Sequence, residues 1–245
     1  MLPELATPFH WEGDHIAAEV NGARALFTTR RGGVSGGPFD SLNLGIKTAD
    51  ERANVEENRA RVAAAVGCSW EQFQFGWQVH GATVRRATET RSQVTQEDGQ
   101  ATALSGHPAL VFGADCQPVL LVTGGAVAAL HCGWRTMAAG VITEGVAALR
   151  DVGGDGPVSA LIGPGARACC YEVGEEVHEV FARYDARRGE RNIDLAAIAA
   201  TQLADAGVSE VHDSGLCTMC WFGLFFSHRR DGGVTGRQAG LVWRV

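Results

Sequence analysis

Three side chains that could hold a metal ion stand in or at the end of apolar segments of the sequence. His80 ends the segment FQFGWQVH, Cys116 lies within ALVFGADCQPVLLV, and His131 ends AVAALH. Two imidazoles and one thiolate are ligands that zinc prefers, and three protein ligands leave a fourth position open, as in catalytic zinc sites. Pro118 indicates a strand end or an edge strand beside Cys116. Because the three residues are far apart in the sequence, this pattern permits a metal site without requiring one.

The same residues allow other interpretations. His80 or His131 could activate Cys116 as the nucleophile of a hydrolase. A single His at the end of an apolar segment is also often a hydrogen-bonded core residue. Asp115, beside Cys116, would face the opposite side of a strand, where it could orient a ligand His, transfer a proton or cap backbone amides. The residues alone leave these alternatives open.

The seven cysteines include two short groups, Cys169–Cys170 and Cys217-x-x-Cys220. Without a secretory signal, free thiols or ligands are expected rather than a disulfide framework. A CxxC pair could belong to a redox site or to a zinc ribbon, but a ribbon needs a second CxxC, which the sequence lacks. Small buried hydrophobes are therefore the main expectation for four of the cysteines, namely Cys68, Cys132, Cys217 and Cys220.

The composition excludes several classes of function. The chain has 245 residues, 45% of them hydrophobic, and a net charge of −7. Such a charge argues against a general nucleic-acid binder, but a few arginines could still bind a small anion. No apolar run reaches the ~18–20 residues that span a bilayer, and the first residues lack the pattern of a secretory signal. We therefore expect a cytoplasmic protein with neither a nucleic-acid nor a membrane partner.

Hydrophobic periodicity predicts a single α+β domain over residues 1–245, with a mixed β-sheet and packed helices, because several strands follow one another without an intervening helix. Helices are predicted over residues 51–67, 137–153, 174–184 and 194–207. Single strands are predicted over residues 23–30, 73–80, 82–88, 158–165, 224–233 and 238–245. The segment 109–134 is expected to form two strands around the turn at Gly124–Gly125. The glycine-rich segment 31–45 is expected to be a flexible loop near the site.

Taken together and in order, these stretches resemble the YfiH-like laccase-domain family, formerly described as multicopper polyphenol oxidases. The matching motifs are FTTRRGGVSGGPFDSLNLG, NVEENRARV, WQVHGATV, GADCQPVLL, ALHCGWR, CCYEVG and FFSHRRDGGVTGRQAGLV. The resemblance implies a single-domain α+β fold similar in core topology to a bacterial cysteine-hydrolase toxin domain. It also implies zinc bound by His80, Cys116 and His131, with copper as the alternative metal.

The resemblance further implies phosphorolysis of purine nucleosides, with inorganic phosphate as the second substrate, and deamination of adenosine. Adenosine, inosine, guanosine and methylthioadenosine are the nucleosides expected. Bacterial relatives are also linked to peptidoglycan editing. The chain departs from the usual family pattern at Gln100, Cys132, Thr136 and Ala166, none of which is an implied ligand. A thiol at Cys132 stands next to His131, but strand alternation should turn it away from the metal.

Phosphate binding is expected from arginines, whose planar guanidinium can bind two oxygens. Arg30, Arg31, Arg135 and Arg237 stand in the matching motifs next to glycines, or close to them. Arg135, close to His131 in the sequence, and Arg30 are the preferred candidates.

Other substrate contacts are expected from Asn43, through a sugar hydroxyl or the base, and from Tyr171 and Glu172 as lining residues. The Glu-containing signature of known base deaminases is absent, so Asp115 or Asp98 is the expected proton carrier for deamination.

A metal-dependent purine nucleoside phosphorylase with adenosine deaminase activity is therefore the first hypothesis. A Cys116-dependent amide hydrolase in peptidoglycan editing is the alternative, and tightly bound zinc would exclude it by occupying the thiolate. A copper-dependent phenol oxidase is disfavoured because the eight histidines include no His-x-His pair. A binding protein without catalysis would leave the thiol and the histidines unexplained.

Overall fold

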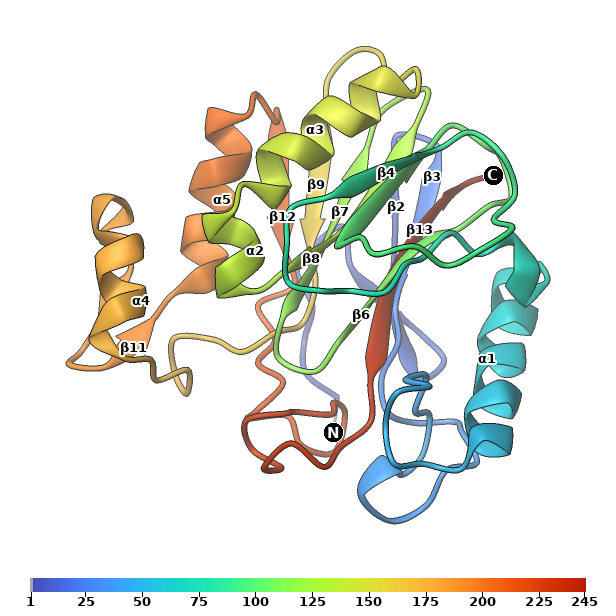
Figure 1. Cartoon of the computed structure of the whole chain (residues 1–245), viewed down its shortest axis with the longest axis horizontal. Helices are drawn as coiled ribbons and strands as arrows, with labels where there is room; N and C mark the ends of the chain where they lie inside the picture. Colours follow the sequence, from blue (N-terminus) through green and yellow to red (C-terminus); the bar gives the residue numbers. More distant parts are fainter. Residues whose placement is uncertain (1) are drawn as a thin grey trace.

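Two β-sheets pack face to face in the computed structural model, which describes residues 2–245 (Figure 1). The five-stranded sheet is antiparallel throughout and has the order β1-β2-β3-β13-β6, with strands β1 (His10–Glu12), β2 (His15–Val20), β3 (Ala23–Phe27), β13 (Gln238–Arg244) and β6 (Ala109–Gly113). The six-stranded sheet is mixed and has the order β12-β9-β7-β8-β5-β4, with strands β12 (Glu210–Asp213), β9 (Ser159–Ile162), β7 (Gln117–Val122), β8 (Val127–Cys132), β5 (Gly99–Thr102) and β4 (Val84–Ala87). A small separate hairpin joins β10 (Arg187–Arg188) and β11 (Asn192–Ile193).

Helices cover the outer faces of both sheets, so the molecule has four layers (Figure 1). One helix, α1 (Arg52–Val66), packs on the five-stranded sheet. The helices on the six-stranded sheet are α2 (Trp134–Ala138), α3 (Val141–Asp151), α4 (Glu175–Val180) and α5 (Leu195–Asp205). Short 3-10 turns are η1 (Gly37–Phe39), η2 (Trp70–Gln72) and η3 (Ala182–Tyr184). Among residues 2–245, no helix combines the length and the hydrophobicity that a bilayer crossing requires.

The central strands are apolar on both faces because each face is covered. In β7, Leu120 points into the layer between the two sheets, whereas Val119 and Leu121 point toward the helices. This alternation follows from the two-residue period of a strand. β7 and β8 thus form the buried centre of the fold, and the predicted mixed sheet is the six-stranded sheet to which they belong.

Local signals placed two helices correctly. Helix α1 ends at Gly67, whose φ of 81° is left-handed and whose amide donates to the carbonyl of Ala63. Its buried face includes Val55 and Val62, as predicted. The carboxylate of Asp194 accepts a hydrogen bond from a backbone amide in the first turn of α5, which confirms the predicted N-cap.

Other predicted elements are divided or shorter. The helix predicted over 137–153 is interrupted at Gly140, whose φ of 92° is left-handed, so that α2 and α3 are separate. The helix predicted over 174–184 changes to a 3-10 turn after α4. The segment 109–134 forms three strands, because the chain crosses from one sheet to the other between β6 and β7. Asp115 lies in this crossing with a φ of 94°, so it does not face the far side of a strand as expected.

Two strand predictions are wrong. The segment 73–80 forms only isolated β-bridges. The side chain of Gln78 forms two hydrogen bonds with the backbone of Phe112 in β6, where a regular strand would use its own backbone. Nε2 donates to the carbonyl at 2.7 Å, and Oε1 accepts from the amide at 2.8 Å. The segment 224–233 is made of turns, and the amides of Leu224 and Phe225 bond back to the carbonyl of Trp221. Leu224 and Phe225 pack in the layer between the sheets without pairing in either sheet.

Candidate active site

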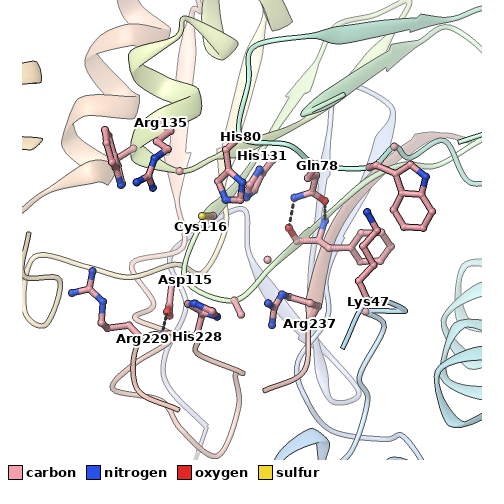
Figure 2. Close-up of a pocket in the computed structure, with 18 of the residues that line it drawn as sticks. Lys47, Gln78, His80, Asp115, Cys116, His131, Arg135, His228, Arg229 and Arg237 are labelled. Atoms are coloured by element: carbon pink, nitrogen blue, oxygen red, sulfur yellow. Dashed lines mark hydrogen bonds between the residues drawn. The ribbon is translucent and has the colours of Figure 1, made fainter. Parts of the chain in front are cut away.

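Three predicted ligands converge at one end of the two sheets. His80 comes from the irregular segment before β4, Cys116 from the crossing between β6 and β7, and His131 from β8. Their ligand atoms all lie within 4.8 Å of one another, and the two imidazole rings are 5.0 Å apart at an angle of 74° (Figure 2). Two imidazoles and a thiolate at this separation fit the donor chemistry of zinc.

The buried carboxylate of Asp98 fixes both histidines. Its Oδ1 accepts hydrogen bonds from Nδ1 of His131 at 2.9 Å and from the amide of His80 at 3.0 Å. Its Oδ2 accepts from the amides of Val79 at 3.2 Å and Gly81 at 2.7 Å. These bonds hold His80 at a left-handed φ of 63°, which is costly for a residue with a Cβ. Such a carboxylate–histidine contact orients the imidazole and leaves its Nε2 available to a metal.

Because Asp98 is fully buried and both of its oxygens are occupied, it positions the ligands and is not placed to carry protons to a substrate. Burial alone would raise the pKa of this carboxyl, but the hydrogen bonds from His131 and from the backbone amides lower it below its usual range.

Cys116 and His131 stabilise each other's charged forms. Burial raises the pKa of the Cys116 thiol, but the charge of His131 and the hydrogen bonds from both histidines outweigh it and lower the pKa to about 6. Burial likewise lowers the pKa of His131, whereas Cys116 and Asp98 raise it to about 9. The thiol is therefore readily ionised near neutral pH, and the thiolate is the form that binds metals.

The residues next to His131 in HCGWR keep space for the sulfur. A Cβ at Gly133 would lie 2.7 Å from Sγ of Cys116, closer than such contacts allow. Cys132 points into the core between β8 and the helices, as strand alternation predicts. Burial there raises the pKa of its thiol, so this second cysteine does not compete for the metal.

The three ligands lie on the wall of a cavity of about 480 Å³. Its lining includes five cationic side chains, namely Lys47, Arg59, Arg135, Arg229 and Arg237. None of the five forms an ion pair with a carboxylate of residues 2–245. Asp115 is the one carboxylate among the described lining residues. In a protein of net charge −7, this local excess of positive charge suits an anionic ligand.

Aromatic rings line the cavity on both sides of the three ligands. Arg135 lies on one side of them in Figure 2, and Gln78 and Lys47 lie on the other. Nζ of Lys47 is 4.1 Å from the ring of Trp77, and the Arg135 guanidinium is 4.1 Å from the ring of Trp134. Flat apolar surfaces of this kind, with a few polar groups between them, suit a planar aromatic ligand.

Tyr171 lines the cavity and carries a hydroxyl group. Burial, helped by the nearby Cys116, raises the pKa of this hydroxyl to about 12. The group is therefore protonated near neutral pH and can donate a hydrogen bond.

The structure brings Arg135, Arg237 and Tyr171 to the cavity but not Arg30 or Asn43. Both side chains are used inside the protein, which is why they cannot face a substrate. The Arg30 guanidinium donates to two backbone carbonyls and stacks on an aromatic ring. Asn43 is fully buried, and its Oδ1 accepts the amides of Gly45 and Arg237, both at 2.9 Å.

Two further expected lining residues, Arg31 and Glu172, are also absent from the described lining. The Arg31 guanidinium donates to the carbonyl of Gly223, and the backbone carbonyl of Glu172 accepts from Arg229. Asp115 does line the cavity, where its Oδ1 accepts from the hydroxyl of Thr218 and its Oδ2 from the amide of Arg229, both at 2.7 Å.

Several cavity residues were not predicted, and four of them carry polar or aromatic side chains of interest. Trp77, His228 and Arg229 lie in the motifs WQVHGATV and FFSHRRDGG, so membership of a matching motif was an available signal for them. Lys47 is the single lysine of the chain, and that rarity was the only signal it offered.

Comparison with known proteins agrees with this geometry. Residues 24–245 match the family described as multi-copper polyphenol oxidoreductase laccase. The chain belongs to this laccase-domain family. A Pseudomonas aeruginosa protein named purine nucleoside phosphorylase PA4543 is 40% identical over 234 residues, which cover 90% of this chain and 93% of that protein. The Escherichia coli protein named purine nucleoside phosphorylase YfiH is 36% identical over 237 residues, covering 93% and 96% of the two chains.

Solved structures of relatives have the same fold. The Bacillus licheniformis protein YfiH, described as hypothetical, has a TM-score of 0.90 at 29% identity and covers 98% of this chain and 100% of its own. The Neisseria meningitidis protein NMB0706 has a TM-score of 0.85 at 34% identity, with coverages of 95% and 99%. The predicted family and the α+β fold class are both confirmed.

Proposed function

We propose that the protein is a cytoplasmic, zinc-dependent purine nucleoside phosphorylase that also deaminates adenosine, and that residues 1–245 act as one catalytic domain. One observation carries the proposal, namely that the three metal ligands and five unpaired cationic side chains line the same cavity. The names of the relatives support it. Adenosine, inosine, guanosine and methylthioadenosine are the proposed nucleosides, and inorganic phosphate is the second substrate.

His80, Cys116 and His131 would hold the metal, with Asp98 keeping the imidazole of His131 and the backbone of His80 in place. Bound zinc would supply a Lewis acid that polarises an oxygen atom or lowers the pKa of water. Zinc fits two imidazoles and a thiolate, and copper is the alternative metal.

Phosphorolysis requires a bound phosphate next to the ribose. A phosphate oxygen attacks C1′, the bond from C1′ to the base breaks, and the base leaves with the electron pair and takes up a proton. Arg135, Arg229 and Arg237 line the cavity and form no ion pairs with carboxylates of the described chain. One guanidinium nitrogen of Arg229 and one of Arg237 donate to backbone carbonyls, and the remaining N–H groups can bind phosphate oxygens. The protonated hydroxyl of Tyr171 is suited to donate a hydrogen bond to the nucleoside.

Asp115 is the proposed proton carrier for deamination, in which water adds to C6 of adenine and ammonia leaves. It is the one carboxylate among the described lining residues. Each of its oxygens accepts one hydrogen bond from the protein, which leaves a further lone pair on each for a substrate or water. Trp77 and Trp134 offer flat surfaces for the base.

An amide hydrolase with Cys116 as the nucleophile is the second candidate, because the lowered pKa of this thiol beside His131 would suit that role as well. Zinc bound tightly by the thiolate would exclude it. Multicopper oxidation is disfavoured, because among residues 2–245 only one metal-ligand cluster contains histidine.

The test is chromatography of adenosine and inosine after incubation with the zinc-loaded protein, with and without inorganic phosphate. We expect phosphate-dependent release of adenine and hypoxanthine, abolished in His80→Ala and Cys116→Ser but retained in the control Cys68→Ser, whose thiol lies outside the cavity. Inosine formed from adenosine without phosphate would support the deaminase activity. Absence of all turnover in zinc-loaded protein would refute the purine assignment.

A further inference from the structure

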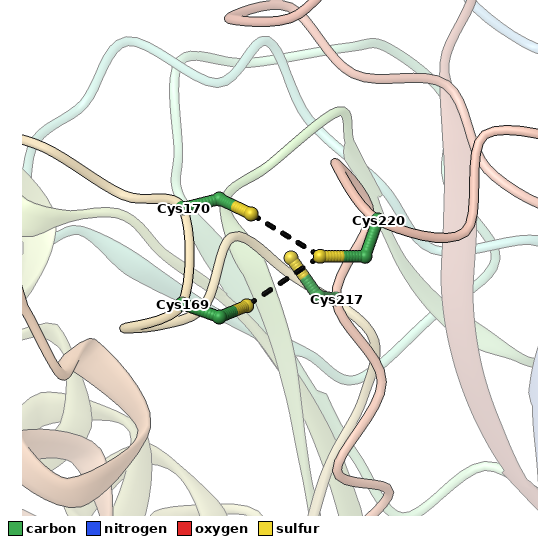
Figure 3. Close-up of side chains that lie close together, drawn as sticks. All are labelled: Cys169, Cys170, Cys217 and Cys220. Carbon is green, nitrogen blue, oxygen red and sulfur yellow. Dashed lines mark hydrogen bonds between the residues drawn. The ribbon is translucent and has the colours of Figure 1, made fainter.

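Four cysteines that have no part in the cavity meet near the molecular surface (Figure 3). Cys169 and Cys170 lie in the turn after β9, and Cys217 and Cys220 lie in the turn after β12. Their four sulfur atoms all lie within 4.8 Å of one another. Sγ of Cys220 is 3.6 Å from Sγ of Cys169 and 3.1 Å from Sγ of Cys170, so all four are free thiols.

We propose that these four cysteines bind a second metal ion, a structural zinc. Four sulfurs placed tetrahedrally about 2.3 Å from zinc are about 3.8 Å apart, which is close to the spacing seen here. A site with four protein thiolates has no open position, so its role is structural rather than catalytic. The adjacent pair Cys169–Cys170 takes the place of the second CxxC that the sequence lacks, and Cys220 is exposed rather than buried as predicted.

Backbone hydrogen bonds hold the two turns in place around the sulfurs. The amide of Trp221 donates to the carbonyl of Cys217 at 3.0 Å and so closes the turn that carries Cys217 and Cys220. The amide of Cys170 donates to the carbonyl of Arg167 at 2.9 Å in the other turn. The four sulfurs are therefore brought together by two ordered turns.

Two arginines lie against the same turns. The Arg230 guanidinium donates to the carbonyl of Thr218 at 2.8 Å, and that of Arg167 donates to the carbonyl of Leu216 at 3.3 Å. Arg230 is paired with Asp231 and Arg167 with Asp213, so these arginines brace the turns and their charges are already compensated. The four sulfurs lie within 4.8 Å of one another. Several thiolates this close together repel one another, so they can coexist only with a cation between them.

The proposed zinc would join two loops that shape the catalytic cavity. Tyr171, which lines the cavity, directly follows Cys170, and Thr218, which donates to Asp115, directly follows Cys217. The loops are otherwise linked by few backbone bonds, such as that from the amide of Thr218 to the carbonyl of Gly165 at 3.0 Å. Loss of the metal should therefore loosen one side of the cavity and leave the catalytic ligands in place.

The test is the zinc content of the purified full-length protein, measured by mass spectrometry after reconstitution with excess zinc and removal of unbound metal. We expect two zinc ions per chain in the wild type and one in the double variant Cys169→Ser/Cys220→Ser. One is also expected in His80→Ala/His131→Ala, which loses the other ion, and two in the control Cys68→Ser. The double variant Cys169→Ser/Cys220→Ser should also unfold at a lower temperature than the wild type, since metal binding contributes to folding.

Cobalt provides a second measurement, in which all four cysteines stay unchanged. In the wild type saturated with Co²⁺, the four-thiolate site should give the intense visible bands of tetrahedral thiolate-bound cobalt, and these bands should remain in His80→Ala. One zinc per chain in folded wild type, or reaction of Cys169, Cys170 and Cys220 with a thiol reagent at equal rates with and without zinc, would overturn the proposal.

Discussion

Substitution of Asp98 by asparagine should weaken metal binding although residue 98 is not a ligand. The carboxylate accepts hydrogen bonds from Nδ1 of His131 and from the amides of Val79, His80 and Gly81. An asparagine of the same shape replaces one acceptor oxygen by an NH₂ group. This group must face either the amides of Val79 and Gly81 or the Nδ1–H of His131, so donors are placed against donors in a fully buried position.

Two magnitudes follow from this contact. Loss of a carboxylate that orients a ligand histidine typically lowers metal affinity about 10- to 100-fold, which corresponds to about 1.4–2.7 kcal/mol. Each buried amide left without an acceptor lowers the free energy of unfolding by about 1–3 kcal/mol. The assay is competition for zinc between the protein and a chelating dye, together with urea unfolding of the metal-free form.

The neighbouring residue supplies a matched control. Glu97 is also buried, and its carboxylate accepts from Arg85 at 2.9 Å and from Thr95 at 2.6 Å without contacting a metal ligand. Glu97→Gln should therefore lower the free energy of unfolding without changing zinc affinity. Unchanged zinc affinity in Asp98→Asn, or an equal loss of affinity in both variants, would refute the positioning role.

Three further predictions concern the cavity. Arg135→Ala should raise the KM for phosphate about 10- to 100-fold, as expected for a lost charge-assisted hydrogen bond of about 1.5–3 kcal/mol, whereas Arg30→Ala should leave it unchanged because Arg30 lies outside the cavity. Equal effects on KM would contradict this placement. Tyr171→Phe should lower kcat/KM about 10-fold with unchanged zinc content, and a loss of zinc would instead point to a structural role. In metal-free protein, iodoacetamide should alkylate Cys116 with a midpoint near pH 6, because His131 outweighs burial and lowers the thiol pKa to about 6. Since the pKa is depressed, the stability contributed by this thiolate is full above the unfolded value of 9.0 and is lost as the pH falls through about 6. A midpoint near 9 would show that the thiolate is not stabilised.

Elements with local signals could be predicted from the sequence. Helix α1 has a glycine stop at Gly67, and α5 has an aspartate cap at Asp194, because caps and stops depend on neighbouring residues only. The ligands His80, Cys116 and His131 could be named because their types are unusual at the ends of apolar segments, and the family motifs selected them among the eight histidines.

Features that depend on distant parts of the chain could not be predicted. The crossing between β6 and β7 leaves no break in the hydrophobic pattern, because the residues on either side of it are largely apolar and buried. The sequence therefore did not show that these two strands belong to different sheets. Asn43 and Arg30 were chosen by residue type, yet their partners come from segments that are remote in the sequence, such as residues 222 and 237. The cluster of four cysteines could not be predicted either. Cys169–Cys170 and Cys217–Cys220 are far apart in the sequence, and they meet only because the loops that carry them lie side by side in the fold.

The most direct test of the central claim is the initial rate of hypoxanthine release from inosine in the presence of phosphate, measured as zinc is returned to metal-free protein. The account predicts no release without phosphate, a rate that rises with the zinc bound until the site of His80, Cys116 and His131 is full, and no recovery in Cys116→Ser. Release that is independent of zinc, or that persists in Cys116→Ser, would contradict it.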